Sequence, residues 1–177
     1  ATIVAGKIRV VAQGTVTIPA SQSGNSNYNA ATNIGRSITV AGLSQTITFN
    51  AIPSKVVGDP DFEIGATVSS GLPLSYTSSN PAVATIVGSN IRIVTDGNTT
   101  ISVFQPGNDT YARASTVSQN LTVNKLQQTI TFNAFTNKVF GDPDFEIGAT
   151  ASSGLAPTYI SSNPAIAAIM GTKVQIL

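Results

Sequence analysis

The feature that most constrains this chain is an internal repeat with a spacing of 83 residues. The decapeptide GDPDFEIGAT occupies residues 58–67 and returns unchanged at residues 141–150. When the chain is aligned with itself at this spacing, without gaps, residues 128–177 match residues 45–94 at 33 of 50 positions. Self-similarity over this length is typical of a structural unit that recurs along the chain.

The same spacing extends the repeat to the start of the sequence, where residues 1–44 match residues 84–127 at 18 of 44 positions. We therefore predict three segments: the second half of one repeat at 1–44, a complete repeat at 45–127, and the first half of another at 128–177. A repeat cut in half would leave apolar strand faces without their partners. We therefore expect the chain to be a window from a longer array.

The hydrophobic pattern within one repeat predicts strands. QTITF at residues 45–49 alternates polar and apolar side chains, and TVSQNLTV at residues 116–123 places Val117, Leu121 and Val123 on one face with polar residues between them. Gly-, Pro- and Asn-rich turn signals separate such runs every eight to twelve residues. No segment has a sustained helical period. About seven short strands in one repeat are typical of an immunoglobulin-like sandwich, so we predict an all-β chain of tandem immunoglobulin-like β-sandwich repeats.

The sequence also resembles a known family. The segment LSYTSSNPAVATIVGSNIRIVTDGNTTISVFQPGNDTY, residues 74–111, is similar to the group-2 bacterial immunoglobulin-like domains. The QTITF opening and the GN-x-x-Y motif near the end of the repeat add to the resemblance. It implies a β-sandwich and an extracellular role like that of the stalk modules of invasin- and intimin-like adhesins. Such domains also serve as spacers in secreted multidomain enzymes, and the resemblance implies no catalytic residue.

Composition argues against several classes of function. The chain has nine basic and eight acidic residues, scattered so that no region is strongly basic. Nucleic acid and anionic membranes are therefore not expected as partners. The chain contains no Cys, His or Trp. The absence of Cys and His removes thiol nucleophiles, Ser–His catalytic pairs and most structural zinc sites. We predict no enzymatic activity, no cofactor and no assigned metal site.

The repeated decapeptide holds six of the eight acids, and it is the best candidate for chemistry. Carboxylates spaced i, i+2 and i+4 point the same way in an extended chain and could hold Ca²⁺. The competing interpretation is a turn at Gly58-Asp59-Pro60 followed by a strand with solvated carboxylates, and it is favoured because Phe62 and Ile64 interleave with the acids. Calcium binding remains open at two triads, Asp59/Asp61/Glu63 and Asp142/Asp144/Glu146. A glycosidase-like carboxylate pair lacks an aromatic platform and is not favoured.

Two lysines and two tyrosines are further candidates for specific roles. Lys55 and Lys138 lie near Asp59 and Asp142 and could form an internal amide, although solvated lysines are the simpler interpretation. Tyr28 and Tyr111 precede the last strand of a repeat, where immunoglobulin-like sandwiches place a corner tyrosine. We expect these two tyrosines to pack in the core or at this corner.

These observations favour a non-catalytic structural repeat of a long secreted or cell-surface protein, acting as a stalk or spacer. Its expected partners are neighbouring repeats of the same polypeptide, with host or surface glycans or proteins bound by domains outside this window. One alternative is a glycan- or protein-binding module that uses exposed loops such as SQSGNSNYN, residues 21–29. Another is an extracellular fibre that assembles by strand exchange between repeats.

Overall fold

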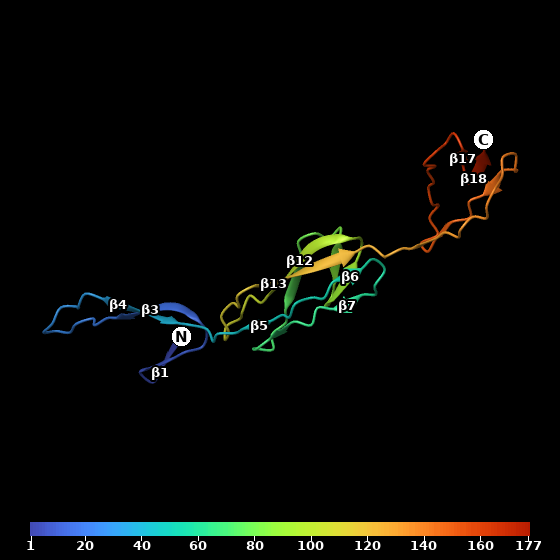
Figure 1. Ribbon diagram of the computed structural model, residues 1–177. Coiled ribbons are helices and arrows are strands. Elements are labelled where there is room, and N and C mark those ends of the chain that lie inside the picture. The colour runs from blue at the N-terminus through green and yellow to red at the C-terminus, as the bar shows by residue number, and fades with distance from the viewer. The chain divides into compact units, whose positions relative to one another are not determined.

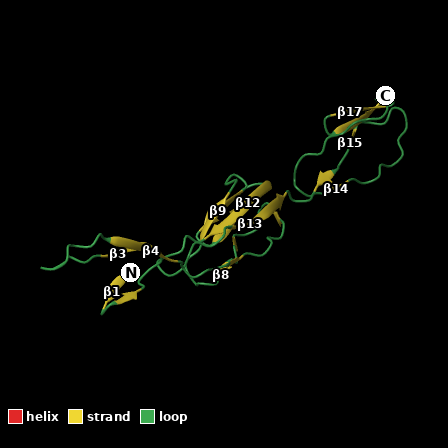
Figure 2. Ribbon diagram, turned by 90° about the vertical axis from the view of Figure 1, so that its left-hand side faces the viewer, coloured by secondary structure: helices red, strands yellow, loops and turns green.

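A computed structural model describes residues 1–177 and contains strands and loops without a helix (Figure 2). The prediction of an all-β chain is confirmed. The strands are β1 (Thr2–Val4), β2 (Lys7–Arg9), β3 (Gly14–Ala20), β4 (Ile34–Val40), β5 (Ile47–Thr48), β6 (Lys55–Val56), β7 (Phe62–Glu63), β8 (Thr67–Val68), β9 (Ser75–Ser78), β10 (Ala84–Val87), β11 (Asn90–Ile93), β12 (Gly97–Phe104), β13 (Val117–Asn124), β14 (Ile130–Thr131), β15 (Phe145–Glu146), β16 (Thr150–Ala151), β17 (Ala167–Met170) and β18 (Lys173–Ile176).

The chain divides into two compact units, Ala1–Lys125 and Leu126–Leu177. The first unit contains the predicted segment 1–44 and all but the last two residues of the predicted segment 45–127. The boundary between these two segments, at residues 44 and 45, stays a prediction. The second unit holds the predicted segment 128–177.

Two sheets enclose the core of the first unit between residues 45 and 125. One has the order β10-β11-β7 and the other the order β6-β13-β12-β9. Strands β12 and β13 form a long antiparallel hairpin, visible at the centre of Figure 1. Strand β6 pairs with β13 in parallel. Strands β5 and β8 form a separate two-stranded antiparallel pair, and β5 lies within the QTITF segment.

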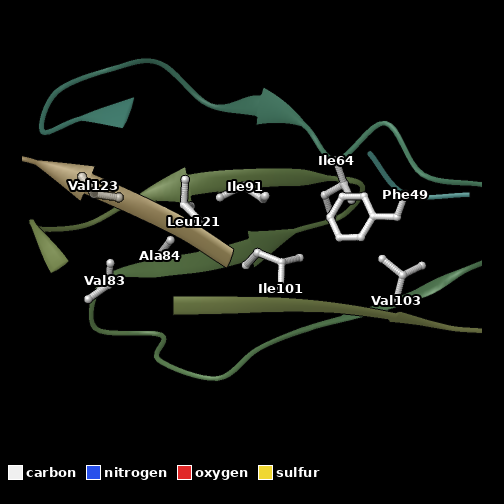
Figure 3. Close-up of a cluster of buried hydrophobic side chains, with 9 residues drawn as sticks. All are labelled: Phe49, Ile64, Val83, Ala84, Ile91, Ile101, Val103, Leu121 and Val123. Carbon is white, nitrogen blue, oxygen red and sulfur yellow. The ribbon is translucent and has the colours of Figure 1, made fainter. Parts of the chain in front are cut away.

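The core between these sheets is a single apolar cluster (Figure 3). The β12–β13 hairpin contributes Ile101, Val103, Leu121 and Val123, and three of these side chains have no exposed surface. Residues from the other sheet and from the loops complete the cluster: Phe49, Ile64, Val83, Ala84 and Ile91. The predicted inward face of residues 116–123 is thus confirmed, because alternate side chains of a strand point to the same face of a sheet.

The decapeptide forms the turn and strand that its sequence predicts. Gly58 has a φ of +93°, a conformation that glycine adopts without steric cost. The short strand β7 follows, and Ile64 is buried just after it. The identical residues 141–150 behave alike, with Gly141 at a φ of +94°.

Strand pairings 83 positions apart coincide. The β3–β4 hairpin pairs Gly14 with Val40, and β12–β13 pairs Gly97 with Val123. The pairs β1–β2 and β17–β18 have the same register as β10–β11. In the same way, β14–β16 matches β5–β8, and β15–β18 matches β7–β11. The registers of these pairs therefore follow the local sequence, whereas β6 and β9 have no counterpart strands at residues 138–139 and 158–161.

Burial does not follow the same rule, because several corresponding side chains are covered within residues 45–125 and exposed in the segments on either side. Phe49 is 6% exposed, whereas Phe132, in the identical QTITFNA segment, is 53% exposed. Leu121 is fully buried, whereas Ile38 at the corresponding position of β4 is 38% exposed. The reason is that residues 45–125 contain both sheets of the sandwich, and the segments on either side each contain strands of one half only.

Candidate functional site: the junction at Leu43

A hydrogen-bonded junction joins the β3–β4 hairpin to a loop of the region that follows it. The Gln13 N–H donates to Asp109 O at 3.0 Å, and the Leu43 N–H donates to Thr110 O at 2.8 Å. The Ala112 N–H donates back to Leu43 O at 2.9 Å. Leu43 and Tyr111 also form a parallel bridge. The residues before β3 and after β4 are therefore both held by the loop between β12 and β13.

The Gln13 side chain adds two contacts to this junction. Its Nε2 donates to Asn108 O at 2.5 Å and to Tyr111 O at 3.1 Å. The loop is held in shape to receive it, because Asn108 Oδ1 accepts from the N–H groups of Thr110 and Tyr111, both at 2.9 Å. An Asn side chain that bonds to the backbone two and three residues later stabilises a tight turn.

Gly42 sets how closely the two segments approach. A Cβ at this residue would lie 2.4 Å from Gln13 Oε1 and 2.5 Å from Ala112 N. Real Cβ atoms do not approach other heavy atoms so closely, so any larger residue here must push the junction apart.

We therefore predict that Gly42→Ala loosens the junction without unfolding the core. The amide protons of Leu43 and Ala112 should lose protection in hydrogen–deuterium exchange by NMR, while that of Leu121 keeps it. The matched control is Gly35→Ala, a glycine of β4 whose added Cβ would meet only the side chain of Thr17. Equal protection of Ala112 in the Gly42 and Gly35 variants would contradict the close-approach argument.

The junction loop has a second copy at residues 22–28. The sequences QSGNSNY and QPGNDTY share Gln, Gly, Asn and Tyr. Asn25 Oδ1 accepts from the N–H groups of Asn27 and Tyr28 at 2.9 and 3.0 Å, as Asn108 does in its loop. No hydrogen bond links residues 22–28 to another segment outside the β3–β4 hairpin. This loop thus has the same Asn-centred turn as residues 105–111.

Tyr28 corrects one prediction. Its side chain is 74% exposed, so it packs neither in a core nor at a corner. Tyr111 is half-buried, and its hydrogen bonds in the junction use its backbone atoms. The conserved feature of the two loops is thus the Asn-centred turn, which fixes the backbone without using the phenol group.

The acidic residues of the first decapeptide have separate structural roles. Asp59 Oδ2 accepts from the Val56 N–H at 3.2 Å and closes the turn. Asp61 makes a two-pronged ion pair with Arg92, whose Nε and Nη2 both donate to Oδ2. This hydrogen bond, and then the attraction of the carboxylate charge, raises the pKa of Arg92 above its usual value. Glu63 lies in β7 opposite Asn90.

The second decapeptide repeats this arrangement in part. Asp142 Oδ2 accepts from the Val139 N–H at 3.1 Å, and Glu146 lies 3.7 Å from the Lys173 ammonium. Neither the residues Asp59/Asp61/Glu63 nor Asp142/Asp144/Glu146 form a group of three side chains that could share one metal ion. The structure supports the turn-and-strand interpretation of the decapeptide.

The two lysines considered for an internal amide pack on aromatic rings. Lys55 Nζ lies 4.6 Å from the centre of the Phe62 ring, and Lys138 Nζ lies 4.9 Å from that of Phe145. A cation over an aromatic face is a favourable contact. The carboxylates of Asp59 and Asp142 bond to backbone N–H groups, so the lysines and aspartates are engaged with different partners.

Sequence reasoning missed Gln13 and Gly42 as junction residues. The signal for the loop was present, since the Q-x-G-N-x-x-Y motif occurs twice. No such signal exists for Gln13, because the corresponding residue is Asp96, which lies 3.9 Å from Lys125 as an ion pair. Lys125 in turn corresponds to Gly42, so the two positions differ together between the copies.

Two further observations bear on what the chain does. The structure has no helix with the length and apolar character that crossing a membrane requires. In comparisons with known proteins, no protein-family model matches the chain, and no curated protein is significantly similar to it in sequence.

Proposed function

We propose that this chain is a non-catalytic stalk or spacer segment, built from tandem immunoglobulin-like repeats of 83 residues in a long secreted or cell-surface protein. The observation that carries the proposal is the junction at Leu43. It joins two successive segments through direct backbone hydrogen bonds, and residues 41–44 form the short linker between them. A short, bonded connection limits the motion between neighbours, as a spacer requires.

The strand order supports the immunoglobulin-like assignment. In that fold one sheet contains strands in the order A-B-E-D and the other in the order C-F-G. The order β7-β11-β10 corresponds to B-E-D, and the order β9-β12-β13 corresponds to C-F-G. Strand β6 corresponds to an additional early strand that pairs in parallel with the last one.

The parallel β6–β13 pair suits a segment under tension. Strand β6 lies near the start of residues 45–125, and β13 lies at the end. A pull on the two flanking linkers would load their hydrogen bonds in shear, including the bond from the Val57 N–H to Asn124 O at 2.9 Å. Bonds loaded in shear must break together, which raises the force that the pair resists.

The proposal predicts that length grows with copy number. Duplicating residues 45–127 in frame should increase the maximum dimension of the particle by a constant step for each added copy, because each repeat contacts only its neighbours. Small-angle X-ray scattering of the monomeric protein measures this dimension. A chain that stays equally compact as copies are added, or that binds a glycan array with specificity, would contradict a spacer role.

A further inference from the structure

Two residues at the base of the β3–β4 hairpin make the bonded junction at Leu43 possible, and we call them the junction pair. They are Gln13, which comes just before β3, and Gly42, which comes two residues after β4. The two residues are neighbours in space, since a Cβ added to Gly42 would lie 2.4 Å from Gln13 Oε1. Gln13 bonds to the loop of residues 105–112 through its side chain, and Gly42 allows the close approach because it has none.

The corresponding residues of the next repeat are Asp96 and Lys125, at the base of the β12–β13 hairpin. They are neighbours too, and they form an ion pair with 3.9 Å between Lys125 Nζ and Asp96 Oδ2. The backbone enters both hairpins alike, because Gly14 and Gly97 have φ values of +135° and +137°. At this position the two hairpins therefore differ in their side chains.

Lys125 does not fit the close approach that Gly42 permits. Gly42 does not have a positive φ, so its backbone conformation is open to other residues. What requires glycine is space, because an added Cβ would lie 2.5 Å from Ala112 N. Any side chain at this position, lysine included, must push Ala112 away and weaken the bond that its N–H donates to Leu43 O.

Asp96 does not fit the role of Gln13 either. Gln13 Nε2 donates to Asn108 O and to Tyr111 O. An ionised aspartate has acceptors only, so it can bond to neither carbonyl oxygen. Gln13 also lines a cleft of about 190 Å³ together with Asp109. An aspartate in place of Gln13 would add a second negative charge beside this cleft.

The other side of the junction does not vary in this way. The two residues whose carbonyl oxygens accept from Gln13 are Asn108 and Tyr111, and the second copy of the loop keeps them as Asn25 and Tyr28. Both copies of the loop also have the Asn-centred turn. The receiving loop is thus constant, and the junction pair is the variable part.

We propose that the junction pair determines whether two neighbouring repeats are locked together. Gln with Gly locks them, as at Leu43, whereas Asp with Lys leaves the connection free to bend. The inference rests on the proposed function, because it takes successive repeats to meet through a hairpin base and a loop of this kind. A stalk built from both kinds of pair would be stiff at some connections and flexible at others.

The first test transfers the Asp–Lys pair to the locked junction of the full chain. In the double variant Gln13→Asp, Gly42→Lys, the amide protons of Leu43 and Ala112 should lose about tenfold or more in protection from hydrogen–deuterium exchange, because two side-chain hydrogen bonds are lost. The amide proton of Leu121, in the core, should keep its protection. NMR measures the three amide protons in one experiment.

The matched control introduces the same two residue types elsewhere in the same hairpin. Thr15 and Thr39 lie opposite each other in β3 and β4, with their hydroxyl oxygens 2.9 Å apart, and neither bonds to the loop. Thr15→Asp with Thr39→Lys should leave the protection of Ala112 unchanged. Loss of protection in this control as large as in the junction variant would overturn the proposal, and so would full protection of Ala112 in the junction variant.

The second test is a gain of order, which misfolding cannot imitate. Duplicating residues 45–127 in frame within the full chain creates a junction in which Asp96 and Lys125 of the first copy meet residues 105–112 of the second. Asp96→Gln with Lys125→Gly in the first copy should lock this junction. The chain has no Cys, so cysteines that replace the exposed Ser118 in both copies take spin labels specifically. Pulsed electron paramagnetic resonance should show a broad distribution of label distances with Asp and Lys, and a single narrow peak with Gln and Gly.

Equal widths in the two duplicated chains would overturn the proposal, and so would a narrow peak already present with Asp96 and Lys125. Small-angle X-ray scattering of the same two chains separates this failure from that of the spacer role. Both duplicated chains should be longer than the original chain if the repeats form a spacer. A chain that does not lengthen contradicts the spacer role, whereas chains that lengthen with equal peak widths contradict the junction pair alone.

Discussion

Replacing Leu121 by alanine should lower the free energy of unfolding of residues 45–125 by about 3 kcal/mol. Leu121 has no exposed surface and lies on β13, in the cluster that both sheets share. Removing three carbon atoms there costs the transfer free energy of those atoms and leaves a cavity that the surrounding strands cannot fully close. Urea denaturation, monitored by circular dichroism, measures the change.

The matched control is Ile38→Ala at the corresponding position of β4. This side chain is 38% exposed, so its truncation should cost less than about 1 kcal/mol. A similar loss for both variants would mean that Ile38 is covered in solution, and that the contrast between the two hairpins is wrong.

Replacing Gln45 by alanine should destabilise the same region by about 2 kcal/mol. Gln45 is a buried polar side chain whose Nε2 donates to Gln105 Oε1 at 2.8 Å and to Ala112 O at 2.7 Å. Its Oε1 accepts from the Ser70 hydroxyl. Truncation leaves the half-buried Ala112 carbonyl and Ser70 hydroxyl without this partner and removes one of the two donors to Gln105 Oε1, which costs more than the bonds themselves contribute. Ala112 also belongs to the junction, so its amide proton should exchange faster.

Gln128 is the control for Gln45, because it begins the second QTITFNA segment. It is exposed, and its Oε1 accepts only from the Ser153 hydroxyl at 2.5 Å. Gln128→Ala should change stability by less than about 0.5 kcal/mol, as is usual for surface substitutions. Thermal denaturation of both variants tests the difference. If the two variants melt alike, the buried network around Gln45 contributes nothing.

The faces of the strands could be predicted from the sequence because they depend on local alternation. Val117, Leu121 and Val123 were assigned to one face from their spacing, and in the structure they face the core. The turn at Gly58 followed from residue types that favour positive φ. In both cases the deciding interactions lie within a few residues of one another.

The junction could be predicted only in part. The Asn-centred loop recurs as a motif, so its importance was visible in the sequence. The residues that contact this loop could not be predicted. Gln13 and Gly42 lie far from Ala112 in sequence, and they differ from the corresponding residues Asp96 and Lys125. A contact between such distant residues depends on how the segments pack, and a single sequence does not encode that in any local pattern.

What the sequence determined by itself is the inward faces of the strands and the registers of the pairs β1–β2, β3–β4, β14–β16 and β17–β18, which match those of the corresponding pairs in residues 45–125. What only the tertiary structure decided is which of those faces are covered. Phe49 and Phe132 have the same neighbours in sequence, yet one is buried and the other is open. The physical reason is that a strand fixes the direction of a side chain locally, whereas burial requires a second sheet, and in residues 45–125 that sheet comes from a distant part of the sequence.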